Sequence, residues 1–166
     1  MVSDILNTEL LKSIEGKKRE LDTFRPFSPE IVRKLEEQFT TEWTYNSNAI
    51  EGNTLTLRET ELVINRGITI GNKSLSEHFE ALNHKEGIQY VYDVVKKKKQ
   101  LSHFQNSVSF GSGFEKTILE LHKIILKNID ELEAGRYRTS NVMITGAVHI
   151  PPSAVKISRL MNEFFE

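Results

Sequence analysis

The sequence predicts an all-α protein that carries one short β-hairpin, and three observations support this fold class. Apolar residues recur every three or four positions over several long stretches, as on the buried face of a helix. Serine or threonine stands where most of these stretches begin, and glutamate often follows three residues later, which is typical of a capped helix start. Residues 141–150 change to an alternating pattern around a glycine, which indicates a hairpin.

The first expected helix begins after Ser28. Ser28 offers a capping hydroxyl, Pro29 suits the first helical position, and Glu30 places a negative charge in the first turn. The apolar positions then recur every four residues, at Ile31, Leu35, Phe39 and Trp43. This spacing predicts one long helix with a single apolar face.

Three further helices are expected after Thr56, Ser74 and Ser112, because each of these residues precedes a glutamate by three positions. The helix after Thr56 should end near Gly67, and the helix after Ser74 should continue to about Lys99. The helix after Ser112 carries an apolar stripe that we expect to be core: Phe114, Ile118, Leu121, Ile125 and Ile129.

The carboxy-terminal part predicts the hairpin and a last helix. Residues 141–150 alternate apolar and polar side chains on both sides of Gly146, so they should form the hairpin. Pro151 and Pro152 then end it, and a helix follows from Ala154 to Glu166. The apolar side of this helix needs a cover, so we expect the chain to self-associate through its carboxy-terminal helix.

Composition excludes several classes of protein. Lysine and arginine number 22 against 23 acidic residues, a net charge of −1 that does not favour nucleic acid as a partner. No apolar stretch of about 18 residues is present, so no membrane span is expected. The chain has no cysteine, which fits a cytoplasmic location and excludes a thiolate metal site. The five histidines lack zinc-ligand spacing, so no metal site is expected, and His122 should be a packed or hydrogen-bonded side chain.

The segment from Ser47 to Asn53 is a candidate site. Ser47 and Glu51 are four residues apart and would share one face of a helix, while Ile50 would lie on the side of Trp43 and anchor the turn. The alternative is an ordinary helix end, with Glu51 in solvent and Gly52 as a left-handed terminator. Taken alone, this segment favours the ordinary helix end.

A second segment, later in the chain, supports a functional role for residues 47–53. A helix containing His122 precedes Gly135-Arg136-Tyr137-Arg138, the predicted hairpin, Pro151-Pro152 and a last helix. This order resembles the Fic (filamentation induced by cAMP) family, whose members transfer AMP from ATP to protein hydroxyls. Ser47-x-x-x-Glu51-Gly52 is similar to the inhibitory motif of that family. The resemblance covers roughly residues 39–166.

The resemblance implies roles for particular residues. Ser47, Glu51 and Gly52 would form an inhibitory site close to ATP, in which Glu51 pairs with an arginine that otherwise holds the γ-phosphate. The hairpin would be a flap that docks an extended segment of a target protein, through Val142, Ile144, Gly146 and His149. ATP with magnesium would be the cofactors of the complete protein.

The catalytic motif of the family, His-x-Phe-x-(Asp/Glu)-Gly-Asn-Gly-Arg-x-x-Arg, is absent from this chain. We therefore expect no catalytic residue here. Residues 1–104 would form an amino-terminal helical region with the inhibitory helix, and residues 105–166 the front part of a Fic core that is cut before its active-site loop. Two alternatives stay open. The chain could be a non-enzymatic helical interaction module, or a relative that transfers another phosphate-containing group.

Overall fold

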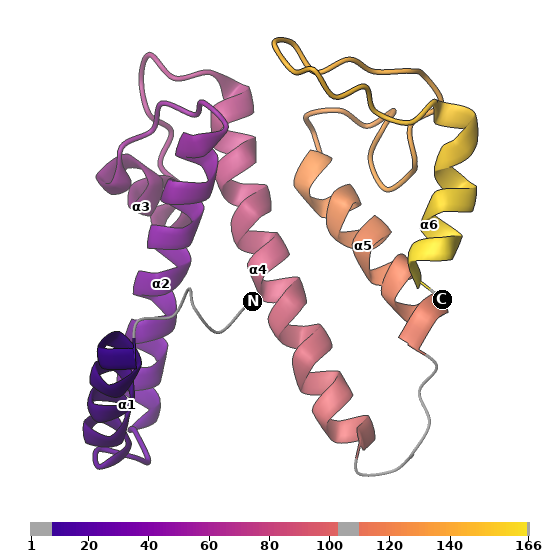
Figure 1. The fold of residues 1–166 in the computed structure, drawn as a ribbon. Coiled ribbons are helices and arrows are strands. Elements are labelled where there is room, and N and C mark those ends of the chain that lie inside the picture. The colour runs from indigo at the N-terminus through magenta and orange to yellow at the C-terminus, as the bar shows by residue number, and fades with distance from the viewer. Residues whose placement is uncertain (1–7, 103–109, 166) are drawn as a thin grey trace. The chain divides into compact units, whose positions relative to one another are not determined.

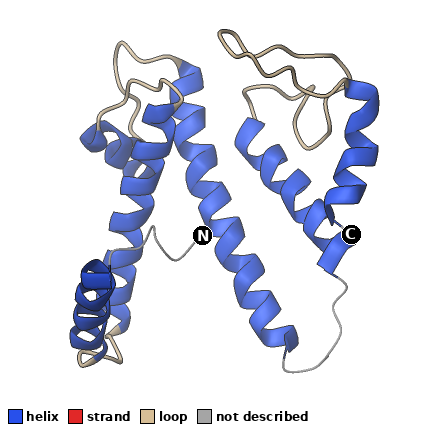
Figure 2. Ribbon diagram, viewed as in Figure 1, coloured by secondary structure: helices blue, strands red, loops and turns tan. Residues whose placement is uncertain are grey.

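The computed structural model describes residues 8–102 and 110–165 as a series of helices (Figures 1 and 2). The chain divides into two compact units, residues 1–39 and residues 40–166, with the boundary inside α2. The boundary between residues 104 and 105 that the sequence suggested lies outside the described residues. None of the described helices is long and apolar enough to cross a membrane. The elements are α1 (Thr8–Asp22), α2 (Pro29–Ile50), α3 (Leu57–Arg66), α4 (Leu75–Ser102), α5 (Phe110–Leu126), the 3-10 turn η1 (Ala154–Lys156) and α6 (Ile157–Phe165).

The first unit contains α1 and the beginning of α2. The sequence analysis did not predict α1, and this helix has no buried residue. The start of α2 agrees with the prediction, because the backbone N–H of Ile31 donates to Ser28 Oγ at 3.4 Å. Ion pairs between residues four apart, such as Arg33 with Glu37, follow on the exposed surface of this helix.

The second unit has a small apolar core made of Leu55, Val63, Ile64 and Ala81, against which Ile70 packs. The capping box predicted at Thr56 is present and starts α3, which ends at the left-handed Gly67 as predicted. The box predicted at Ser74 also forms, because Glu77 N–H donates to Ser74 Oγ at 3.2 Å and Ser74 N–H to Glu77 Oε2 at 2.8 Å.

Helices α4 and α5 meet through a glycine and a buried amide. A Cβ atom at Gly87 would lie 3.1 Å from Ile125 Cδ1, so the missing side chain lets the two helices approach closely. Asn83 is only 3% exposed. Its Nδ2 donates to the carbonyls of Ile125 at 3.0 Å and Lys127 at 2.6 Å. A side chain on α4 thus supplies the hydrogen-bond donor that carbonyls at the carboxy-terminal end of α5 lack within their own helix.

The predicted β-hairpin is wrong. Residues 141–150 form a loop with one tight turn, closed by Ala147 N–H to Ile144 O at 3.1 Å, and no strand occurs among the described residues (Figure 2). The apolar side chains of the alternating pattern cover no surface, since Ile144 and Ile150 are 56% and 78% exposed and Val148 is fully exposed. An isolated two-stranded hairpin without such packing is at best marginally stable.

Two expectations about the last helices also change. Because α5 already includes Phe110, Ser112 lies inside the helix and does not cap it. The last helix is α6, preceded by η1, and it packs on α5. Phe165 meets Phe114 edge to face with centroids 5.9 Å apart, whereas Phe164 is 71% exposed. The apolar side of α6 is therefore covered in part.

The first testable prediction concerns Asn83. In Asn83→Leu the side chain keeps its size but cannot donate, so two carbonyls at the end of α5 lose their partners. We expect the free energy of unfolding to fall by about 1–3 kcal/mol. Asn46→Ala is the control, because Asn46 is exposed and its Nδ2 donates to the Glu42 carbonyl at 2.8 Å within the same helix. Urea denaturation followed by circular dichroism measures both, and an equal loss for the two variants would contradict this role of Asn83.

Candidate functional site

The structure places Ser47, Glu51 and Gly52 at the carboxy-terminal end of α2. Ser47 lies in the last turn of the helix, and Glu51 follows directly after Ile50. Gly52 adopts φ +97°, a conformation that favours glycine. Ser47 and Glu51 are both exposed, and no hydrogen bond joins their side chains within the described residues. The Glu51 carboxylate therefore faces solvent at the tip of a helix.

The anchor of this helix end differs from the one expected. Ile50 is 83% exposed, so it does not hold the turn to the core. Asn53 does so instead, because its Nδ2 donates to Glu77 O at 3.0 Å and to Glu80 Oε2 at 2.8 Å. Its Oδ1 accepts the N–H of Leu55 at 3.0 Å, and Leu55 belongs to the core. Sequence reasoning missed Asn53, although it stands directly after the motif.

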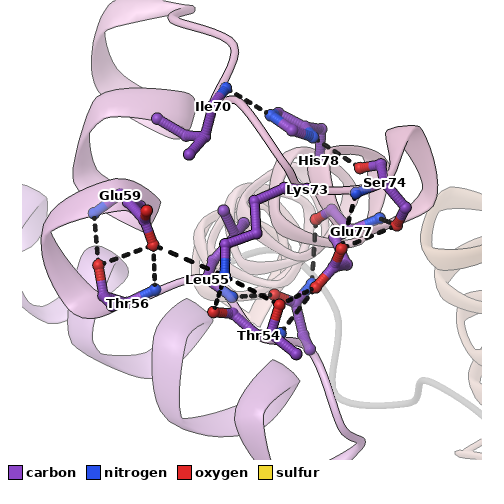
Figure 3. A network of polar contacts seen from close by, with 10 residues as sticks. Thr54, Leu55, Thr56, Glu59, Ile70, Lys73, Ser74, Glu77 and His78 are labelled. Atoms are coloured by element: carbon purple, nitrogen blue, oxygen red, sulfur yellow. Dashed lines mark hydrogen bonds and ion pairs between the residues drawn. The ribbon is translucent and has the colours of Figure 1, made fainter.

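Glu77 at the beginning of α4 completes the anchor (Figure 3). Its Oε1 accepts the N–H of Thr54 at 2.9 Å and the hydroxyl of Thr54 at 2.5 Å. Its Oε2 accepts the N–H of Ser74 at 2.8 Å and the hydroxyl of Ser74 at 2.9 Å. The hydrogen bond from the Thr54 hydroxyl, with those from Ser74, lowers the pKa of Glu77 to about 2. We call the contacts of Asn53 and Thr54 with the first turns of α4 the turn anchor.

Lys73 and Glu59 extend this network toward α3. Lys73 Nζ donates to Thr54 Oγ1 at 2.9 Å and also to the Thr54 carbonyl. The same ammonium lies 4.0 Å from Glu59 Oε2, and Glu59 caps α3. The hydrogen bonds from Thr56, together with the charge of Lys73, lower the pKa of Glu59. The segment between α2 and α3 is thus held by polar contacts with Glu77 on α4 and with Lys73, which also lies near Glu59 on α3.

The body of α2 in this unit is fixed separately from the turn. Thr44 is completely buried and its Oγ1 lies 3.1 Å from His84 Nδ1 on α4. Asn65 on α3 donates to Thr41 Oγ1 at 3.2 Å. Burial lowers the pKa of His84, which favours the neutral ring at this contact. These contacts tie the helix to α3 and α4 two turns before Glu51.

The second candidate site is the loop in place of the hairpin. Val142 and Ile144 are 44% and 56% exposed, His149 is exposed, and Gly146 adopts φ +78°. Arg138 closes the base of the loop, because its guanidinium donates to Ser140 O at 2.6 Å and to the Pro152 carbonyl. No hydrogen bond or ion pair joins this loop to the end of α2 within the described residues.

The segment before the loop is organised by His122 and Tyr137. Gly135 N–H donates to His122 Nδ1 at 3.2 Å, which confirms the prediction that His122 is hydrogen-bonded. Tyr137 donates to Glu115 Oε1 at 2.9 Å. Burial, together with the hydrogen bond to Glu115 and its charge, raises the pKa of Tyr137 to about 12. The residues on either side of Arg136 therefore pack onto α5.

Comparisons with known proteins agree with the resemblance found in the sequence. No family model matches the chain. The protein adenylyltransferase Fic of Nematostella vectensis is 31% identical over 96% of this chain, and that of Drosophila persimilis is 28% identical over 98%. The chain spans 34% and 29% of these relatives, about a third of their length.

Solved structures give the same result. A Fic domain-containing signaling protein from Bacteroides thetaiotaomicron matches 92% of this chain with a TM-score of 0.68 and 27% identity, over 54% of its own length. A Fic protein fragment from C. elegans matches 95% of this chain with a TM-score of 0.61 and 25% identity, over 44% of its own length. The chain is similar in sequence and in fold to part of the Fic proteins, which agrees with the resemblance that its motifs indicated.

The second testable prediction is the pKa of Glu77. A pKa lowered from 4.5 to about 2 means that the carboxylate stabilises the turn fully above pH 4.5. This stabilisation decreases as the pH falls below 4.5 and is lost as the pH passes 2. The titration of the Glu77 carboxyl carbon, followed by NMR, should therefore have its midpoint near 2. Thr54→Val removes the largest cause and should move the midpoint upward. A midpoint near 4.5 in the unaltered chain would contradict the anchor.

Proposed function

We propose that this chain is the regulatory and leading portion of a Fic protein adenylyltransferase, and that Ser47 to Gly52 restrain the transfer of AMP to protein hydroxyls. The observation that supports this proposal is the contrast at the end of α2. The residues directly after the motif are held by several hydrogen bonds, whereas the Glu51 carboxylate is exposed. A carboxylate whose turn is held in place, and which makes no ion pair with any other described residue, is suited to bind a cation from outside the described part of the chain.

The proposed partner of Glu51 is an arginine of the Fic motif, which this chain does not contain. A guanidinium and a carboxylate form a bidentate, charge-assisted pair that is stronger than an ordinary hydrogen bond. An arginine engaged by Glu51 cannot also hold the γ-phosphate of ATP. Glu51 thus inhibits by occupying this arginine, and the Ser47 hydroxyl one turn earlier supports the carboxylate.

We propose that the nucleotide and its magnesium are not held by the residues that the structure describes. The described residues contain no group of three or more histidine or acidic side chains that could hold a metal ion. The sequence also lacks a glycine-rich phosphate loop. In this proposal ATP with magnesium is held by the Fic motif of a complete protein, and the contribution of Glu51 is inhibition.

The loop between Ser140 and Pro151 is the proposed contact for a target protein. Val142, Ile144 and His149 offer exposed side chains, and Arg138 fixes the base of the loop. Such a loop can contact an extended segment of the target through its side chains. Fixing the loop at its base reduces the conformational entropy that binding would otherwise cost.

The third testable prediction is that the 166-residue chain alone transfers no AMP. The general base and the phosphate-binding loop of the family both belong to the absent motif, and such groups each contribute about a hundredfold or more to the rate. The measurement is incorporation of labelled AMP into the chain and into a protein mixture, with a Fic relative that has the motif as the positive control. Incorporation above background would show that a base lies within this chain.

The fourth testable prediction is made for a protein that carries this chain together with the Fic motif. Glu51→Gly should raise self-directed AMP transfer strongly, because the arginine is freed. Glu51→Asp should be intermediate, since the shorter carboxylate keeps its charge but reaches less far. Ser47→Ala should act in the same direction more weakly. Incorporation of labelled AMP at equal protein concentration measures all three variants.

Melting curves serve as the folding control for these variants. Glu51 is exposed, so its loss should change the free energy of unfolding by no more than about 1 kcal/mol. If Glu51→Gly melts like the unaltered protein and yet transfers no more AMP, the inhibitory role is wrong and Glu51 is an ordinary helix end.

A non-enzymatic interaction module is the second candidate function, and the exposure of Phe164 at 71% favours it. In that case α6 would bind a partner or a second copy of the chain, which size-exclusion chromatography detects. Glu51→Gly would then leave AMP transfer unchanged, so the same assay distinguishes the two functions.

A further inference from the structure

We infer that Asn53 and Glu77 are positioning residues for inhibition: the turn anchor that they form holds the Glu51 carboxylate at the place where it can occupy the arginine. This inference rests on the proposed function of Glu51. It adds that inhibition depends on side chains that do not themselves meet the arginine or the nucleotide.

The first step of the argument is the short distance along the chain between Glu51 and the anchor. Asn53 N–H donates to Asn48 O at 2.9 Å, so the backbone around Glu51 is folded back onto the last turn of α2. The Asn53 side chain then fixes this folded segment to α4 through Glu77 O at 3.0 Å and Glu80 Oε2 at 2.8 Å. The Glu51 N–H donates to Asn48 O at 3.1 Å, whereas its exposed side chain makes no hydrogen bond or ion pair among the described residues. The backbone at Glu51 is thus held between the last turn of α2 on one side and the Asn53 contacts on the other.

The second step is the charge of Glu77. Its carboxylate accepts donors from Thr54 on one oxygen and from Ser74 on the other, so it joins the turn to the beginning of α4. A neutral amide at this position has only one acceptor oxygen and cannot accept from both sides. The anchor therefore needs a carboxylate and not merely a side chain of that length.

The third step is that loss of the anchor should loosen the turn without unfolding the unit. The contacts of Thr44 with His84 and of Thr41 with Asn65 hold α2 independently of Asn53. The core residues Val63 and Ile64 are held by burial. The anchor can thus change the position of Glu51 while the fold persists, which distinguishes a positioning role from a purely structural one.

The experiment uses three variants that keep the size of the side chain. Asn53→Asp retains the acceptor for Leu55 N–H but removes both donated hydrogen bonds and sets a carboxylate against Glu80. Glu77→Gln removes the charge. Glu131→Gln is the matched control, because Glu131 also accepts a backbone N–H, that of Asn128 at 2.9 Å, but lies after α5 and outside the turn anchor.

Two measurements test the inference. In this chain, amide hydrogen exchange should become faster at residues 51–55 in Asn53→Asp and Glu77→Gln, while the amides of Val63 and Ile64 keep their protection. In the protein that also has the Fic motif, both variants should raise AMP transfer by about tenfold. Glu131→Gln should change neither measurement. Adding Glu80→Gln to Asn53→Asp supplies a donor again and should restore part of the inhibition.

The decisive comparison is with Glu51→Gly. If Asn53 and Glu77 act by positioning Glu51, neither variant should raise AMP transfer further once Glu51 is replaced by glycine. If Glu51→Gly raises transfer and the two anchor variants do not, the positioning role is wrong while the inhibitory role of Glu51 stands. If the anchor variants raise transfer equally with and without Glu51, they act by another route and the inference fails. If Glu51→Gly itself has no effect, the proposed function fails.

Discussion

The carboxylate of Glu77 is the interaction on which the arrangement of the candidate site depends. It starts α4 by accepting from Ser74, and with the same group it accepts from Thr54 in the segment that follows α2. One charge thus satisfies backbone donors at the start of a helix and in a turn 23 residues earlier in the chain. The lowered pKa of Glu77 reflects this double use, since each donor stabilises the charged form.

Buried polar contacts determine how the helices of the second unit meet. Its core has few apolar side chains, while Thr44, Thr60 and Asn83 are almost fully buried. His78 shows why such contacts are specific: its Nε2 accepts Ile70 N–H at 2.9 Å, so its Nδ1 must carry the proton that is donated to Ser74 O at 2.7 Å. Apolar side chains can pack in many arrangements, whereas a buried network of hydrogen bonds is fully formed in only one of them.

The parts of the fold that could be predicted from sequence are those in which the deciding contact is local. The capping boxes at Thr56 and Ser74 join residues three apart, and both form. The same signature failed at Ser112, because the helix begins before it and a local pattern cannot exclude an earlier start. The alternation in residues 141–150 failed for another reason. A strand needs a partner surface, and the exposed Val148 and Ile150 have none.

The candidate site was predictable in its composition but not in its support. Ser47, Glu51 and Gly52 were found because they belong to one short motif, and the structure places them at the carboxy-terminal end of α2, with Glu51 directly after its last residue. Asn53 and Glu77 form their contact across 24 residues, and no periodicity in the sequence pairs them. Ile50 was assigned the anchoring role because it is apolar, yet it is exposed and an amide takes that role.

The different roles proposed for Glu51 and Asn53 follow from the chemistry of their side chains. An inhibitory carboxylate must stay accessible to a guanidinium, so it cannot be fixed by hydrogen bonds that would use its own oxygens. The position of this carboxylate must instead be fixed by neighbouring residues that form their own hydrogen bonds inside the unit. Asn53 can do this because an amide both donates and accepts, which lets it hold α4 and the Leu55 backbone together. A charged residue at position 53 could not make both kinds of contact, so the turn next to Glu51 requires a neutral amide.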